Sequence, residues 1–254
     1  MSDGFFVVDL PSDLTPGVVV EVTGSEAHHM AVVRRLAVGE NVTLTNGQGH
    51  GVHGVVSEAS KSRVKVEVAE SFVAAPDQPV VTVFQALPKQ DRGELAVDLM
   101  TEAGVSDITP WRAARSQVSW SGERGLKAHD KWVQAAREAS KQARRFWVPN
   151  VSDALSPGDV VAASGESDVL IIMHEKATTP IFQAVIPSQG RVGIIIGPEG
   201  GLTDEEVAGF EAVGGKTYSM GSTVLRTSTA GAIAVTQVRL LAHLRAQDQD
   251  GEGR

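Results

Sequence analysis

The chain has no cysteine and one tyrosine, and aromatic residues make up only 5% of its 254 residues. Without cysteine it can form neither a disulfide nor a thiolate metal site. It also has no run of about 18 apolar residues, so we expect no membrane-spanning helix. The N-terminus has no basic region followed by a long apolar stretch, so we expect no signal peptide and a cytoplasmic location.

Two common nucleotide-binding patterns are absent from the part of the chain after residue 80. The chain has no Gly-x-x-x-x-Gly-Lys-Ser/Thr, and its one Gly-x-Gly-x-x-Gly match, Gly49–Gly54, lies in a β-rich run near the N-terminus. A nicotinamide enzyme would need the second pattern after the first strand of its α/β region, and Phe84–Pro88 does not supply it. The rest of the composition, with 42% hydrophobic and 21% charged residues, is that of an ordinary soluble globular protein with one large or two small domains.

The most informative segment begins with an apolar strand at Arg191–Ile196 and continues into the turn Gly197–Gly201, with sequence Gly-Pro-Glu-Gly-Gly. The glycines would let the backbone approach a ligand where a Cβ would collide. Thr203 and Glu206 form a capping-box pattern that predicts a helix to about Val213. A strand, a glycine turn and a helix together are typical of a ligand site, although the turn alone suits an ordinary corner equally well.

The acidic residues around this turn indicate which ligand it suits. Glu199, Asp204, Glu205 and Glu206 would repel a phosphate. They favour a ligand that carries positive charge and hydroxyl groups. S-adenosylmethionine (SAM), with its sulfonium, its ammonium and its ribose diol, has this chemistry.

Several segments together resemble the RsmE family of SPOUT-class RNA methyltransferases, which methylate N3 of a uridine in 16S ribosomal RNA. The likeness covers most of the chain, in order. It is carried by Ile196–Thr203, Met220-Gly221, Leu225–Ala230, Gln85–Lys89, Glu102–Val105, Trp132–Arg145, His28-His29, Val33–Leu36 and Gly39.

The resemblance implies an α/β fold in which a PUA-like, RNA-binding β-barrel precedes a SPOUT domain with a C-terminal trefoil knot. We expect the barrel at 1–73, a linker at 74–79, the SPOUT domain at 80–246 and a disordered tail at 247–254. The family also implies a homodimer formed through the knot helix near 229–244, although the small and apolar residues of this helix suit burial within its own subunit as well.

Local patterns predict the elements independently of the resemblance. Short β-rich runs within residues 5–70 suggest a small barrel, and one helical piece interrupts them at 26–36. Alternating strands and helices after residue 80 imply a parallel sheet with helices on both faces. The expected strands are 80–86, 107–111, 169–173, 191–196 and 216–219, and the expected helices are 93–103, 127–144, 179–185, 204–212 and 229–246.

The family's cofactor segments correspond to three stretches of this chain, which would hold SAM: Met173, His174 and Glu175; Ile196, Gly197, Pro198, Glu199, Gly200 and Gly201; and Met220, Gly221 and Leu225. Arg226 is the candidate for stabilising a uracil anion or orienting the substrate, and Glu138 is a candidate general base. The family often has Glu at the position of Ser228, and its replacement removes a carboxylate near the active loop.

RNA binding must be judged against a net charge of −8. Residues 112–145 nevertheless hold nine basic and three acidic residues, with Trp111, Trp120, Trp132, Phe146 and Trp147 in or beside them. A solvated helix face and core tryptophans would explain the same residues. The candidate RNA contacts are Arg34, Arg35, Arg112, Arg115, Arg144 and Arg145.

The expected partner is 16S rRNA within the small ribosomal subunit, with the target uridine unpaired or splayed out. We expect no metal, because His28-His29 has no third ligand nearby. Two alternatives remain: a SPOUT methyltransferase that acts on another RNA atom such as a ribose 2′-hydroxyl, and a non-catalytic RNA-binding ribosome-assembly factor.

Overall fold

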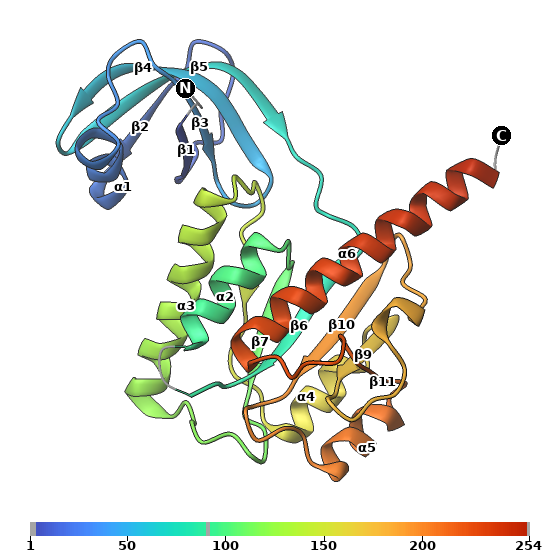
Figure 1. Cartoon of the computed structure of the whole chain (residues 1–254). Coiled ribbons are helices and arrows are strands. Elements are labelled where there is room, and N and C mark those ends of the chain that lie inside the picture. Colours follow the sequence, from blue (N-terminus) through green and yellow to red (C-terminus); the bar gives the residue numbers. More distant parts are fainter. Residues whose placement is uncertain (1–3, 90–91, 253–254) are drawn as a thin grey trace. The chain divides into compact units, whose positions relative to one another are not determined.

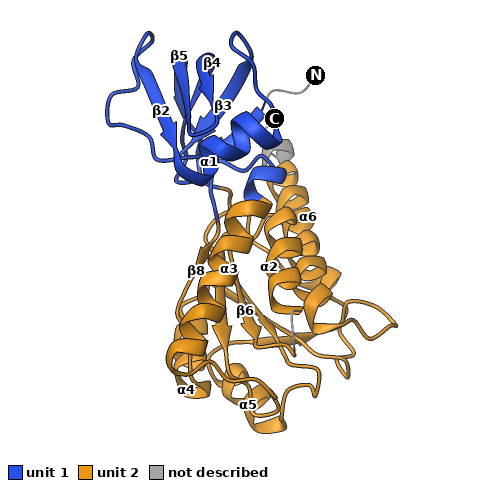
Figure 2. Ribbon diagram, turned by 90° about the vertical axis from the view of Figure 1, so that its left-hand side faces the viewer, with its two compact units in different colours: residues 1–76, 140–148 blue, residues 77–139, 149–254 orange. Residues whose placement is uncertain are grey.

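The computed structural model describes residues 4–89 and 92–252, and it divides the chain into two compact units (Figure 2). Unit 1 comprises Met1–Pro76 and Ser140–Val148, and unit 2 comprises Asp77–Ala139 and Pro149–Arg254. Among the described residues, none of the helices combines the length and the apolar character needed to cross a membrane.

Unit 1 is built on one five-stranded mixed sheet with the order β1-β3-β4-β5-β2. Strand β1 runs parallel to β3, and the other neighbours are antiparallel. The edge strands are β1 and β2, so a mixed sheet takes the place of the small barrel that the sequence suggested. The strands are β1 (Gly4–Val7), β2 (Val19–Thr23), β3 (Asn41–Thr45), β4 (His50–Ser60) and β5 (Arg63–Val73).

A short helical segment supplies the rest of the core of unit 1. It consists of α1 (Gly24–His28) and a π-helical turn at His29–Val33, where the sequence predicted one helix over 26–36. The side chains of Ala27 and Met30 are fully buried in the cluster formed by one face of the sheet. Valines at alternate positions such as Val20 and Val22 provide that face, as period-two burial requires.

Residues 140–148 belong to unit 1, although the sequence analysis placed them within the SPOUT domain. The backbone N–H of Gly49 donates to the carbonyl of Phe146 at 2.9 Å, and that of Val148 donates to Gly47 at 2.9 Å. The indole N–H of Trp147 donates to the carbonyl of Ala74 at 2.9 Å. These contacts join positions that are far apart in the chain, which local patterns do not reveal.

Unit 2 contains a six-stranded parallel sheet with the order β11-β9-β10-β6-β7-β8. Four of its strands have the bounds that the sequence predicted, whereas β8 was not foreseen. The strands are β6 (Val80–Ala86), β7 (Asp107–Trp111), β8 (Asn150–Val151), β9 (Val169–Met173), β10 (Arg191–Ile196) and β11 (Lys216–Tyr218).

The helices of unit 2 confirm the expected alternation and add α4, which the sequence analysis missed. The expected helix at 179–185 is a single 3₁₀ turn at Ile181–Gln183, and α6 continues to Glu252, into the stretch we expected to be disordered. The last two residues of that stretch, 253–254, lie outside the described part. The helices are α2 (Arg92–Glu102), α3 (Gly122–Gln142, whose residues 140–142 belong to unit 1), α4 (Pro157–Ser164), α5 (Asp204–Ala212) and α6 (Thr227–Glu252).

Helices cover both faces of this sheet (Figure 1). On one face, α2 and α6 pack together, and Gly231 of α6 leaves room for Met100 of α2, whose sulfur would lie 2.5 Å from an added Cβ. On the other face, Phe210 of α5 packs edge-on against Trp111 at 5.7 Å. The apolar strands are therefore buried on both sides, as the continuous run at Arg191–Ile196 predicted.

Candidate functional site

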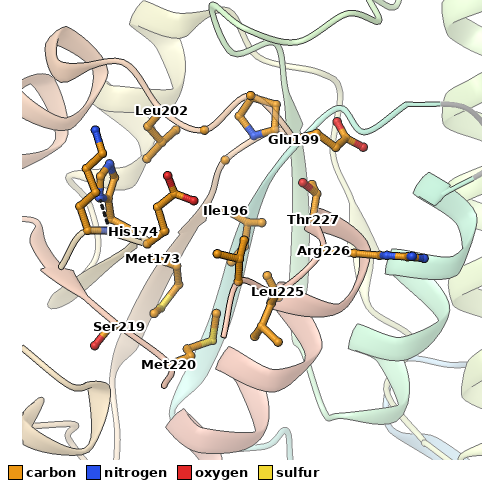
Figure 3. Close-up of a pocket in the computed structure, with 18 of the residues that line it drawn as sticks. Met173, His174, Ile196, Glu199, Leu202, Ser219, Met220, Leu225, Arg226 and Thr227 are labelled. Atoms are coloured by element: carbon orange, nitrogen blue, oxygen red, sulfur yellow. Dashed lines mark hydrogen bonds between the residues drawn. The ribbon is translucent and has the colours of Figure 1, made fainter. Parts of the chain in front are cut away.

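Three loops meet at one edge of the parallel sheet of unit 2. They follow Met173 of β9, Ile196 of β10 and Tyr218 of β11, which are the last residues of three neighbouring strands. The carboxyl ends of parallel strands share an edge, which is where ligands bind in open α/β sheets. A pocket of about 470 Å³ lies there (Figure 3).

The pocket brings together every residue that the sequence analysis proposed for the cofactor. Four apolar side chains, those of Met173, Ile196, Met220 and Leu225, gather in its centre (Figure 3). The others are polar or backbone positions, namely His174, Glu175, Gly197, Pro198, Glu199, Gly200, Gly201 and Gly221.

The glycines of the turn after β10 suit the backbone conformation and the tight packing of this turn. Gly201 has φ +72°, a conformation that favours glycine, and its N–H donates to the carbonyl of Pro198 at 2.9 Å. A Cβ on Gly200 would lie 3.0 Å from the Cβ of Arg115, and one on Gly197 would lie 3.1 Å from Leu202. We predicted these glycines from the close approach of a ligand, and contacts within the chain also restrict the space at Gly197 and Gly200.

The acidic residues at the turn hold backbone amides as well as creating a negative field. Glu199 Oε1 accepts from the N–H of Lys89 at 3.1 Å. Glu206 accepts from Thr203 N at 2.9 Å and from Ala114 N at 2.7 Å, and the predicted capping box with Thr203 is present. The pKa of Glu205 is held below its usual value by its own backbone N–H, by the Thr203 hydroxyl and by the charge of Arg115.

The orientation of His174 is set by a local hydrogen bond. Its Nδ1 accepts from the backbone N–H of Lys176 at 3.2 Å, shown dashed in Figure 3. Because an amide N–H can only donate, Nδ1 must be unprotonated in this arrangement. The neutral ring therefore carries its proton on Nε2, and His174 offers this pocket a hydrogen-bond donor.

Three arginines line the pocket: Arg92, Arg115 and Arg226. The carbonyl of Arg226 accepts from Ala230 N at 2.9 Å, so this residue caps the start of α6, and its side chain extends away from the apolar group (Figure 3). Arg92, the first residue of α2, lines the same pocket, and the sequence analysis missed it. In the sequence, the one sign of a role for Arg92 is its position shortly after Gln85–Lys89, a segment that resembles the family.

The other catalytic candidate lies elsewhere. Glu138 is on α3, where its Oε1 accepts from Gln134 Nε2 at 2.8 Å, and it does not line the pocket. Ser228, where the family often has Glu, is buried and also lies outside the lining residues.

The candidate RNA contacts fall in both units. Arg34, Arg35 and Arg144 are exposed in unit 1, where Arg145 is half-buried. In unit 2, Arg112 and Arg115 are exposed.

The tryptophans are less available for base stacking than the sequence suggested. Trp111 and Trp132 are buried in the core, whereas Trp120 and Trp147 are half-buried. Across the described residues, no group of three or more His, Cys, Asp and Glu side chains is placed to hold a metal ion.

Comparisons with known proteins agree with this geometry. Residues 76–239 match the family model of an RNA methyltransferase domain, and residues 22–69 match that of an RNA methyltransferase PUA domain. Ribosomal RNA small subunit methyltransferase E of Mycobacterium bovis is 37% identical over 241 residues, which span 93% of this chain and 91% of that protein.

Two similar solved structures contain SAM. A methyltransferase of Legionella pneumophila in complex with SAM has a TM-score of 0.84 and 27% identity, over 94% of this chain and 98% of that one. Ribosomal RNA small subunit methyltransferase E of Neisseria gonorrhoeae, bound to SAM, has a TM-score of 0.84 and 25% identity over the same shares.

Proposed function

The chain belongs to the RNA methyltransferase family of ribosomal RNA small subunit methyltransferase E, and we propose that it methylates N3 of a uridine in 16S ribosomal RNA, at position 1498, using SAM. The observation that carries this proposal is the pocket at the carboxyl ends of β9, β10 and β11, formed by the three segments that the family likeness singled out. Its volume is within the roughly 300–1,000 Å³ of small-molecule sites.

The residues present fit SAM by their chemistry. Met173, Ile196, Met220 and Leu225 offer apolar area for an adenine ring. Carboxylates among the lining residues, such as Glu175 and Asp204, suit a ligand with two cationic groups. When bound, SAM would supply an electrophilic methyl group on a sulfonium.

The remaining chemistry concerns the proton on uracil N3, which makes that nitrogen a weak nucleophile at neutral pH. We propose that the guanidinium groups of Arg226 and Arg92 stabilise the negative charge that develops on the uracil as this proton leaves. Both side chains line the pocket, and neither forms an ion pair with another described residue. Glu138 is not proposed as the base, because it does not line the pocket.

We propose that RNA is held by exposed arginines, including Arg34, Arg35 and Arg144 of unit 1. Unit 1 contains the segment that matches the PUA family model, and guanidinium groups bind phosphates through paired N–H donors. The partner would be 16S rRNA within the small ribosomal subunit, which places the reaction in the cytoplasm.

We also propose that the SPOUT domain contains a C-terminal trefoil knot and that the protein forms a homodimer through its C-terminal helix. The small residues Ala230, Gly231 and Ala234 are used inside the subunit, where they are buried. Exposed apolar side chains beyond them support a partner surface: Leu240 and Leu244 on α6, and Phe182 in the 3₁₀ turn that contacts α6. Large exposed apolar groups on one face are typical of protein interfaces.

The test combines SAM titration calorimetry with methyl transfer to small subunits that lack the modification, followed by mass-spectrometric mapping. Binding of SAM and a new N3-methyluridine are expected. A methylated ribose would support the 2′-hydroxyl alternative. Absence of SAM binding would contradict the proposal and favour the assembly-factor alternative.

A further inference from the structure

The loop after β7 is closed on itself and anchored in the core of unit 2. The N–H of Ala113 donates to Ser116 Oγ at 3.2 Å, and the N–H of Ser116 donates back to the carbonyl of Ala113 at 3.0 Å. Ala113 is buried in the cluster that contains Trp111, Leu202 and Phe210. The loop is therefore a firm support, although its neighbours Arg112 and Arg115 are exposed.

This loop holds the glycine turn of the pocket at two points. At the first, Arg115 Nη1 donates to the carbonyl of Gly200 at 3.0 Å and to that of Leu202 at 3.2 Å. At the second, the N–H of Ala114 donates to Glu206 Oε1 at 2.7 Å. The closeness of the Arg115 Cβ to Gly200 shows that the two segments are also in steric contact.

We propose that Arg115 is a positioning residue for the SAM-binding turn rather than an RNA contact, and that it acts together with Glu206 as a clamp. The proposal rests on the proposed use of SAM. The two carbonyls that Arg115 binds flank Gly201, so the clamp sets the direction of the peptide groups that line the pocket. When backbone groups are already oriented for the ligand, binding does not have to order them. The affinity is higher because this free-energy cost is absent.

The geometry requires a guanidinium. One Nη1 atom has two N–H donors, and here they reach two different carbonyls from a planar, rigid group. Lysine, with an ammonium group on a flexible chain, would keep the positive charge but could not hold two N–H donors in this fixed geometry. Glu206 is similarly specific, because its two carboxylate oxygens accept from Thr203 N and Ala114 N, and an amide could replace only one of them.

The variant Arg115→Lys distinguishes a role of Arg115 in positioning the turn from a role in binding RNA. A residue that binds RNA phosphate through its charge would be largely preserved in this variant, with an unchanged salt dependence. If Arg115 positions the turn, the lysine would lose its paired hydrogen bonds to the two carbonyls. We then expect the Kd and the KM for SAM to rise about tenfold, as for the loss of one hydrogen bond to a charged group. The KM for the ribosomal subunit is expected to stay at the wild-type value.

Arg112→Ala is the matched control. Arg112 is exposed on the same loop, and its backbone N–H binds the carbonyl of Leu155 rather than the turn. Its loss should leave SAM affinity unchanged. Glu206→Gln should reproduce the SAM defect of Arg115→Lys, because it breaks the second point of the same clamp.

Hydrogen exchange of residues 199–206 in the ligand-free protein completes the experiment. Faster exchange in Arg115→Lys and Glu206→Gln, but not in Arg112→Ala, is expected. Wild-type exchange in Arg115→Lys, or wild-type SAM affinity in that variant, would overturn the clamp. A wild-type protein that does not bind SAM would instead contradict the proposed function, since the exchange measurement needs no ligand.

Discussion

The Nζ atom of Lys141 lies 3.1 Å from Oε2 of Glu26, and the two side chains are only 3% and 16% exposed. Lys141 is at the end of α3 and Glu26 is in α1, and both residues belong to unit 1. The ion pair therefore ties residues 140–148 to the N-terminal part of unit 1. His29 Nδ1 is 3.8 Å from the other oxygen of Glu26.

Lys141→Met should destabilise unit 1, because it leaves the Glu26 carboxylate buried without its cation. Removing one partner of a buried pair typically costs about 3 kcal/mol or more. The double variant Glu26→Leu with Lys141→Met should recover most of this loss. Urea unfolding of the three proteins measures the difference, and equal stability of the single and double variants would contradict a role for the pair.

Arg226→Gln should lower kcat about 100-fold, as expected when one group that stabilises developing charge is removed. SAM affinity should change little. The deficit should shrink at alkaline pH, where the uracil proton dissociates more readily without help. Methyl transfer measured across pH tests this, with Lys216→Gln, at the opposite end of β11, as the control. A deficit that does not change with pH would argue against stabilisation of the anion.

Gly201→Ala should cost about 1–2 kcal/mol, because a side chain is strained at φ +72°. It should also weaken SAM binding, since the residue lines the pocket. Gly158→Ala is a matched control: this glycine is in α4, has no atom within 4 Å of an added Cβ, and should be neutral or slightly stabilising. Thermal unfolding and calorimetry of both variants report the two effects, and similar results for both would refute the argument.

Burial raises the pKa of Asp107, and hydrogen bonds from Thr82 and Asn150 and the charge of Arg191 oppose this only in part. A carboxyl whose pKa is raised on folding favours the folded state at low pH, and this contribution is lost as pH rises through the folded value. Asp107→Asn should therefore be more stable than the wild type at neutral pH, with a difference that decreases on acidification. Thermal unfolding at several pH values measures it, and a constant difference would contradict the assignment.

Leu240→Glu should dissociate the proposed dimer, because it places a charge on the exposed apolar face of α6. Leu126→Glu on α3 is the control, since Leu126 is also exposed but lies away from α6 and should leave the assembly unchanged. Sedimentation of the wild type and of both variants decides the matter. A monomeric wild type would refute the dimer.

Sequence patterns predicted the elements whose signals are local. The apolar run at Arg191–Ile196 and the capping box of Thr203 and Glu206 gave the observed bounds of β10 and α5, because burial on both faces and amide capping leave direct marks on neighbouring residues. Helix α4 was missed although Ser156 accepts from Asp159 N and Pro157 follows it, which are ordinary helix-start signals.

The sequence by itself determined the two-part organisation, the parallel sheet and, through its likeness to a family, the residues of three loops that line one pocket. The tertiary structure alone decided that residues 140–148 pack in unit 1, that Arg92 lines the pocket and that Glu138 does not. It also showed that Arg115, a candidate RNA contact, donates hydrogen bonds to the carbonyls of Gly200 and Leu202. Periodicity and capping act between neighbours in the chain, whereas these hydrogen bonds join residues 73 to 115 positions apart, and only the folded chain brings them together.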